Sequence, residues 1–146
     1  MSTVKDVSKI VIQSSSGPIS NLKLQKLLYY VQGWSLALYD KPAFVERIEA
    51  WVHGPVVPEI FYAYRHFRWN PIELGSETVA IPDSEVSHVK EVLKVYGSLT
   101  ATDLESLSHG ETPWIVARDG YGPNEPANAV ISHESMKTYF KSRLVA

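Results

Sequence analysis

The chain has 146 residues, of which 45% are hydrophobic and 21% charged, and this composition suits one globular domain with a single core. The absence of cysteine excludes disulfide scaffolds, thiol nucleophiles and thiolate metal sites. The net charge of -2 weighs against nucleic-acid binding, because proteins that coat phosphates carry a basic excess. The first residues lack the apolar run of a signal peptide, and no stretch reaches the ~20 apolar residues of a membrane helix. We therefore expect a cytoplasmic protein with no membrane partner.

Apolar residues at helical spacing predict a first helix over residues 3–14 and a longer second helix over residues 20–40. In the second helix the leucines form one stripe, which places Lys26 and Gln32 on the opposite, polar side. Gly33 in mid-helix costs ~1 kcal/mol relative to alanine. This cost indicates that another element packs close to the backbone at Gly33.

Weak alternation predicts a short strand over residues 48–52, and residues 77–81 are expected to pair with it. Pro58 suits the first position of a third helix, which ends before residue 70. Breakers and capping residues predict three further helices over residues 83–96, 100–110 and 112–118, followed by a loop over residues 120–129. A last helix is expected to begin at Ser132, with Met136, Tyr139, Phe140 and Leu144 pointing inward. The fold class is therefore mainly α, a compact bundle of about six or seven helices with at most a small two-stranded β-sheet.

The sequence shows no chemistry-bearing motif. It has no local metal-ligand pattern, no glycine-rich phosphate loop and no nucleophile elbow, so we expect no catalytic residue, no cofactor and no metal. Glu49 is expected to be half-buried and to form a structural ion pair with Arg47 or Lys26. Residues 65–69 mix cations with aromatics, which could stack on single-stranded bases, but the negative net charge favours a solvated helix end with Phe67 in the core.

Aromatic residues are numerous, with four tryptophans and eight tyrosines. Tyr29 and Tyr30 are adjacent on one helix and are not expected to face the same core stripe, and Tyr62 lies off the apolar face of the third helix. Accessible tyrosine and tryptophan side chains commonly anchor protein interfaces. For each single tyrosine, partial burial and a binding role remain equal alternatives.

Several blocks of the sequence match one family pattern. The blocks are Leu22 to Tyr30 with Gly33-Trp34, then Ile48 to Trp51, His53 to Pro58, Leu107 to His109, and Pro113-Trp114. Together they resemble the Panacea domain of the SocA-like antitoxin family, which includes GepA-like phage-associated proteins. The resemblance spans nearly the whole chain, so residues 1–146 are expected to form a single Panacea-like domain.

The resemblance implies a non-enzymatic antitoxin that neutralises a cognate protein toxin by binding it directly. It also implies an alternative, because one branch of the family delivers its toxin to an ATP-dependent protease. The match begins near Val4, so no further N-terminal DNA-binding domain is expected, and Ser35 stands where relatives often carry histidine. A third hypothesis, a small-ligand-binding protein or enzyme, would need a concave pocket with convergent polar groups.

Most of the matched residues are expected to specify the fold. The toxin would then meet the more exposed polar and aromatic positions around the second helix and the Gly54-Pro55 turn. The predicted contact set is Lys26, Tyr30, Trp51, His53, Glu59 and Tyr62.

Overall fold

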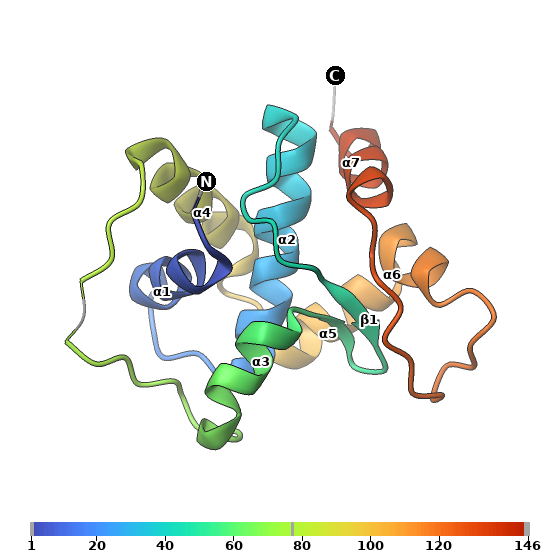
Figure 1. The fold of residues 1–146 in the computed structure, drawn as a ribbon, viewed down its shortest axis with the longest axis horizontal. Helices are drawn as coiled ribbons and strands as arrows, with labels where there is room; N and C mark the ends of the chain where they lie inside the picture. Colours follow the sequence, from blue (N-terminus) through green and yellow to red (C-terminus); the bar gives the residue numbers. More distant parts are fainter. Residues whose placement is uncertain (1, 77, 145–146) are drawn as a thin grey trace.

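A computed structural model describes residues 2–76 and 78–144 (Figure 1). The described residues form seven α-helices, one short 3₁₀ helix and one two-stranded antiparallel sheet, which confirms the predicted mainly α fold. The elements in chain order are α1 (Val4–Ser14), α2 (Asn21–Tyr39), β1 (Glu49–Trp51), β2 (Gly54–Val56), α3 (Pro58–Tyr64), η1 (Arg65–Phe67), α4 (Asp83–Tyr96), α5 (Ala101–His109), α6 (Thr112–Ala117) and α7 (His133–Ser142).

Helix α2 runs through the middle of the molecule, with α1 and α4 on one side and α6 and α7 on the other (Figure 1). The Ser20 hydroxyl caps its start by accepting a hydrogen bond from the Lys23 N–H group. Because neighbours enclose α2, its polar residues Lys26 and Gln32 are fully buried. The predicted polar side of this helix is therefore wrong, since α2 is buried on all sides over residues 24–33 and has no solvent face there.

The close approach predicted at Gly33 is confirmed. A Cβ atom added to Gly33 would overlap the Phe140 ring, because α7 packs directly against the backbone of α2 at this point. The Gly33→Ala substitution should therefore lower the free energy of unfolding by about 1–3 kcal/mol, the usual cost of overpacking a core. Urea unfolding checks this, with Gly17→Ala as control, because Gly17 has no atom within 4 Å of an added Cβ. Equal effects of the two substitutions would contradict the close contact.

The small sheet differs from the predicted one. Strands β1 and β2 form a tight hairpin with Glu49 opposite Val56 and Trp51 opposite Gly54. The prediction that residues 77–81 pair with β1 is wrong for residues 78–81, which form no strand, and residue 77 lies outside the described part. The other edge of β1 is covered instead by residues 129–131, since Ala129 accepts a hydrogen bond from Ala50 and Ile131 donates one to Ile48.

Helix ends follow the sequence signals with three exceptions. The Thr100 side chain caps α5 in a capping box with Asp103, as its position predicts. Helix α4 begins after Pro82 without a side-chain cap, although Asp83 or Ser84 was expected to provide one. In the last helix Met136 and Phe140 are buried as expected, whereas Leu144 lies beyond the end of α7 and is exposed, so its predicted inward position is wrong. Thr112 is the first residue of α6 rather than its cap.

Candidate functional site

A buried lysine supports the hairpin from below. The Lys26 ammonium donates a hydrogen bond to the Pro55 carbonyl at 3.1 Å. Gly54, which has φ 113°, fits above the lysine only because it lacks a Cβ, which would come within 2.8 Å of the Lys26 Cε atom. Burial lowers the pKa of Lys26 to about 7, and the charge of Glu105 opposes this shift. Lys26 thus positions the hairpin from inside the protein.

The amide of Gln25 joins the same hairpin to α3. Its carbonyl oxygen accepts a hydrogen bond from the Val57 N–H group at 2.8 Å, and its NH₂ group donates to the Asn21 side chain at 2.9 Å. The Asn21 amide in turn donates to the Phe61 carbonyl at 3.0 Å. These bonds fix the position where the hairpin ends and α3 begins.

A second buried polar group links α2 to the start of α6. The Tyr29 and Tyr30 hydroxyls donate to the same carboxylate oxygen of Glu111, at 3.0 and 3.1 Å. Burial raises the pKa of Glu111 to about 7, although both hydrogen bonds favour the ionised form. Tyr30 also stacks on Tyr96, with ring centres 3.9 Å apart. Both tyrosines are fully buried and both contact Glu111 and Phe140, so the expectation that they do not face the same part of the core is wrong.

The far side of the hairpin is held by Trp114 and Arg118. The Trp114 indole donates to the Trp51 carbonyl at 2.8 Å and stacks against the His109 ring. The Arg118 guanidinium lies over Trp114 and donates to the Ala50 carbonyl at 3.0 Å. It also donates to two carbonyls of the loop after α6. Hydrogen bonds from α2 and from the α6 region therefore hold the hairpin on two sides.

The outward side of the hairpin and α3 carries three touching aromatic rings. The Trp51 ring centre lies 5.1 Å from that of Phe61 and 6.2 Å from that of Tyr62, and the last two are 5.5 Å apart. Trp51 and Phe61 are partly buried, and Tyr62 is 54% exposed. We call the surface formed by Trp51, Phe61 and Tyr62 the hairpin–α3 face.

Glu49 fixes the edge of this face. Its carboxylate accepts a hydrogen bond from the Trp51 indole at 2.9 Å and pairs with the Arg47 guanidinium at 2.6 Å. The predicted structural ion pair of Glu49 with Arg47 is thereby confirmed. On the other edge, the Arg65 guanidinium lies 5.6 Å from the centre of the Tyr62 ring. A cation thus stands at each end of the aromatic surface.

Four members of the predicted contact set are accessible and two are not. Trp51 and Tyr62 belong to the hairpin–α3 face, and Glu59 is exposed on α3. His53 is exposed at the hairpin turn, 3.4 Å from the Glu105 carboxylate. The prediction that Lys26 and Tyr30 are accessible is wrong, because neighbouring elements enclose α2 and bury both side chains completely.

Sequence reasoning missed Phe61 as part of the exposed face. Helical spacing predicts that Phe61 shares the buried side of α3 with Ile60, and Ile60 is indeed buried. Helix α3 has only seven residues and lies beside a hairpin, so its partly covered flank cannot be separated from its buried flank by spacing alone. The position of Phe61 directly before Tyr62 is the sequence signal that could have indicated its place on this face.

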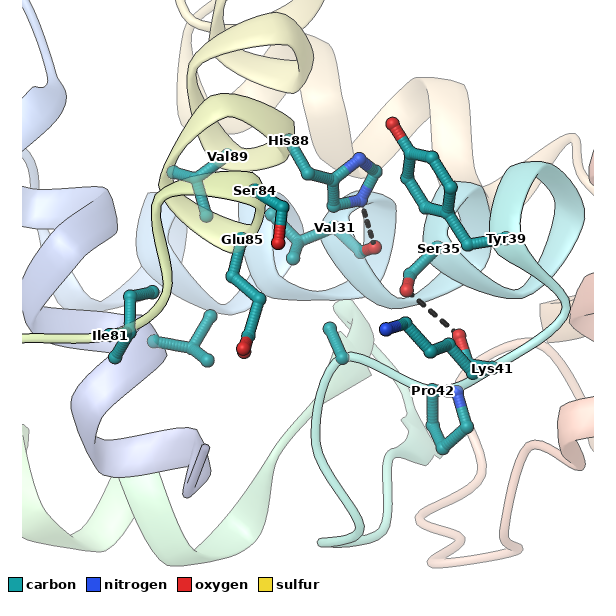
Figure 2. Close-up of a pocket in the computed structure, with 12 residues that line it drawn as sticks. Val31, Ser35, Tyr39, Lys41, Pro42, Ile81, Ser84, Glu85, His88 and Val89 are labelled. Carbon is teal, nitrogen blue, oxygen red and sulfur yellow. Dashed lines mark hydrogen bonds between the residues drawn. The ribbon is translucent and has the colours of Figure 1, made fainter. Parts of the chain in front are cut away.

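A separate pocket of about 390 Å³ lies between α1, α2, α4 and the loop after α2 (Figure 2). Its walls are mostly apolar, with Val7, Val31 and Val89 from three helices. His88 is fixed in it by a hydrogen bond from Nε2 to the Val31 carbonyl at 2.9 Å, and burial lowers the His88 pKa. Its polar lining also includes Ser35, Ser84, Lys41 and Glu85.

The described residues contain no cluster of three or more histidine and acidic side chains that could hold a metal ion. In the same part of the chain, no helix has the length and apolar character required to span a bilayer. The polar contacts of Lys26 and Trp114 hold the hairpin beneath the aromatic surface of Trp51, Phe61 and Tyr62. Aromatic side chains on a surface of this kind are the residue types that are enriched at protein–protein interfaces.

Comparison with known proteins specifies the class further. The family model for the SocA-like antitoxin, Panacea domain, matches residues 24–115. Antitoxin SocA of Caulobacter vibrioides (strain NA1000 / CB15N) is 32% identical in an alignment 145 positions long, and the alignment covers 88% of this chain and 76% of that protein. No solved structure matches the chain. The chain belongs to the SocA-like antitoxin family and carries its Panacea domain.

Proposed function

We propose that the chain is a non-enzymatic cytoplasmic antitoxin that neutralises a cognate protein toxin by binding it directly through the hairpin–α3 face. The observation that carries the proposal is the surface cluster of exposed Tyr62 with partly exposed Trp51 and Phe61 in a member of an antitoxin family. Tryptophan, tyrosine and arginine are the residue types that dominate binding energy at protein interfaces. All three occur on this surface or at its edges.

The rigidity of the face supports the same proposal. The Trp51 indole is held by Glu49, and its backbone carbonyl is held by Trp114. The start of α3 is fixed through Gln25. A surface that is ordered before binding loses less conformational entropy in the complex, and this raises affinity.

Co-expression with the protein encoded by the neighbouring reading frame tests this function. We expect that protein to stop growth alone, and we expect this chain to restore growth and to co-purify with it as a stable complex. Rescue without any complex would contradict direct binding. Toxin half-life separates the adaptor alternative, because delivery to an ATP-dependent protease would shorten it, whereas occlusion would leave it unchanged or lengthen it.

The pocket of Figure 2 favours a second candidate function, the binding of a small ligand. Apolar walls with a few polar groups are typical of ligand sites. Lys41 and Glu85 contribute opposite charges to the lining, which would suit a small zwitterion with an apolar body.

Filling the pocket distinguishes the two functions. Ser84 is exposed at the pocket, so Ser84→Trp should occupy the space without disturbing the core. If the toxin binds the hairpin–α3 face, this variant should rescue growth as well as the wild type, within about twofold in toxin affinity, as expected for a surface change. Loss of rescue by a variant that melts normally would assign the neutralising site to the pocket.

A further inference from the structure

The turn after η1 exposes a tryptophan next to a strained residue. Trp69 is 88% exposed, more than any other large hydrophobic side chain of the described residues. Arg68, directly before it, has φ 55° and ψ -120°, the angles of the first central position of a type II′ turn. A hydrogen bond of 3.0 Å from the Asn70 N–H group to the Phe67 carbonyl closes this turn.

Glycine is the favoured residue at that position of a type II′ turn, because a Cβ is strained at positive φ. The chain instead keeps arginine there, with its side chain exposed. Strained residues of this kind concentrate at functional sites. The strain and the exposed indole are two separate observations on the same four-residue turn, and neither contributes to the packing of the core.

The turn also continues the hairpin–α3 face. Arg65 joins the two, since its guanidinium lies over the Tyr62 ring and its carbonyl accepts a hydrogen bond from the Arg68 N–H group. Figure 1 shows α3 leading from the hairpin to this turn at the lower edge of the molecule. A partner seated on Trp51 and Tyr62 would therefore lie next to the turn.

The charge of this region is opposite in sign to that of the chain. Residues 60–72 contain Arg65, His66 and Arg68 and no acidic residue, whereas the whole chain has a net charge of -2. The side chains of Arg65, His66 and Arg68 are all exposed, and the two arginines carry the positive charge. The turn thus presents an indole within a cationic strip on an otherwise acidic protein.

We propose that this turn is a second docking element for the protein toxin, and that the toxin presents to it an acidic surface with an apolar socket for the Trp69 indole. This inference rests on the proposed function. A protein suits the strip better than a nucleic acid, because exposed Glu59 and Glu73 flank it and would repel a phosphate chain that runs past either end. A folded partner can place its carboxylates opposite the arginines alone.

Two substitutions test the docking element, with the protein from the neighbouring reading frame as the probe. Trp69→Ala should weaken the complex at least tenfold, because an exposed indole that enters a socket is a typical binding hot spot. Arg68→Gly should weaken it about threefold or more, mainly through a slower association rate that depends less on salt. The same variant should melt at an equal or higher temperature, because glycine relieves the strain at φ 55°. A protein weakened in binding but not in folding is the signature of a docking residue.

Lys90→Ala is the matched control, because Lys90 is an exposed cation on α4 and its loss should leave binding unchanged. Unchanged affinity and salt dependence in both turn variants, with weaker binding by Tyr62→Ala, would overturn this inference and leave the proposed function standing. No complex with the wild type would overturn both. Binding of a single-stranded oligonucleotide, or self-association, that is lost only in Trp69→Ala would assign the turn to another occupant and also overturn the inference.

Discussion

Tyr62→Ala should weaken the complex with the toxin at least ~30-fold, which corresponds to the loss of about 2 kcal/mol that defines an interface hot spot. Tyr62 packs beside both Phe61 and Trp51 and has Arg65 above its ring, yet it is 54% exposed in the free chain. Its removal takes apolar area from the interface but leaves the core intact. Surface changes of this type usually alter stability by no more than about 0.5 kcal/mol. Isothermal titration and thermal melting measure the two effects separately.

Tyr121→Ala provides the control, because Tyr121 is 45% exposed in the loop after α6 and does not belong to the hairpin–α3 face. It should bind the toxin as the wild type does. Tyr62→Phe separates the ring from the hydroxyl, and we expect it to retain most of the affinity because the contacts described for Tyr62 are ring contacts. Equal losses in the Tyr62 and Tyr121 alanine variants, or a loss that follows unfolding, would refute the role of this face.

The stability of the free chain should carry an unusual pH dependence from Glu111. Its pKa is about 7 in the folded chain and 4.5 in the unfolded chain, so the folded state binds the proton more tightly. The resulting stabilisation is complete below pH 4.5 and is lost as pH rises through 7. Its upper limit is roughly 3 kcal/mol, from about 1.4 kcal/mol per pKa unit. Most acidic groups with folded-state partners behave in the opposite way.

Glu111→Gln isolates this contribution, because glutamine retains a carbonyl oxygen that can accept the hydrogen bonds of Tyr29 and Tyr30 but has no proton to titrate. Denaturant unfolding at pH 4.5, 6 and 7.5 should show the wild type losing stability relative to the variant by about 1–3 kcal/mol across this range. Using the difference between the two proteins cancels all other titrating groups. Parallel profiles would show that Glu111 keeps its ordinary pKa.

Lys26 is expected to have the opposite effect on stability, which should rise with pH on the alkaline side. Its folded pKa of about 7 lies below the value of 10.5 in the unfolded chain, so the neutral amine is favoured on folding. This contribution is complete above pH 10.5 and is lost as pH falls through 7. The combined contribution of Glu111 and Lys26 to the free energy of unfolding therefore has a local minimum near neutral pH. Both belong to the buried contacts that hold the hairpin and α2, rather than to the proposed binding surface.

Local signals in the sequence specify most of the helices. The Ser20 cap, the start of α3 at Pro58 and the close approach at Gly33 each depend on a single residue and its immediate chemistry, and each is found in the structure. Strand β2 was not predictable in the same way, because Gly54 and Pro55 usually interrupt strands. Here Gly54 adopts positive φ above Lys26. Pro55 needs no donor because its partner Ala50 directs its N–H group to Ala129 and its carbonyl to Arg118, away from β2. Those contacts join residues that are far apart in the sequence, so residue spacing does not predict them.

The candidate site was predictable where exposure depends on one short element. Tyr62 and Glu59 on α3 and His53 at the hairpin turn are exposed, as expected. Lys26 and Tyr30 were misplaced because a charged or hydroxyl-bearing residue on a helix suggests a solvent side, and only the packing of α1, α4, α5 and α7 around α2 removes that side. The same packing explains why polar residues of the family motifs lie inside the protein, where they hold the hairpin.

Hydrogen–deuterium exchange on the purified complex tests the central claim most directly. Toxin binding through the hairpin–α3 face should slow amide exchange in residues 49–65 on addition of the toxin, and leave residues 81–89, which line the pocket on α4, unchanged. Protection confined to residues 81–89, or no change in residues 49–65 in a complex that is stable, would contradict the account.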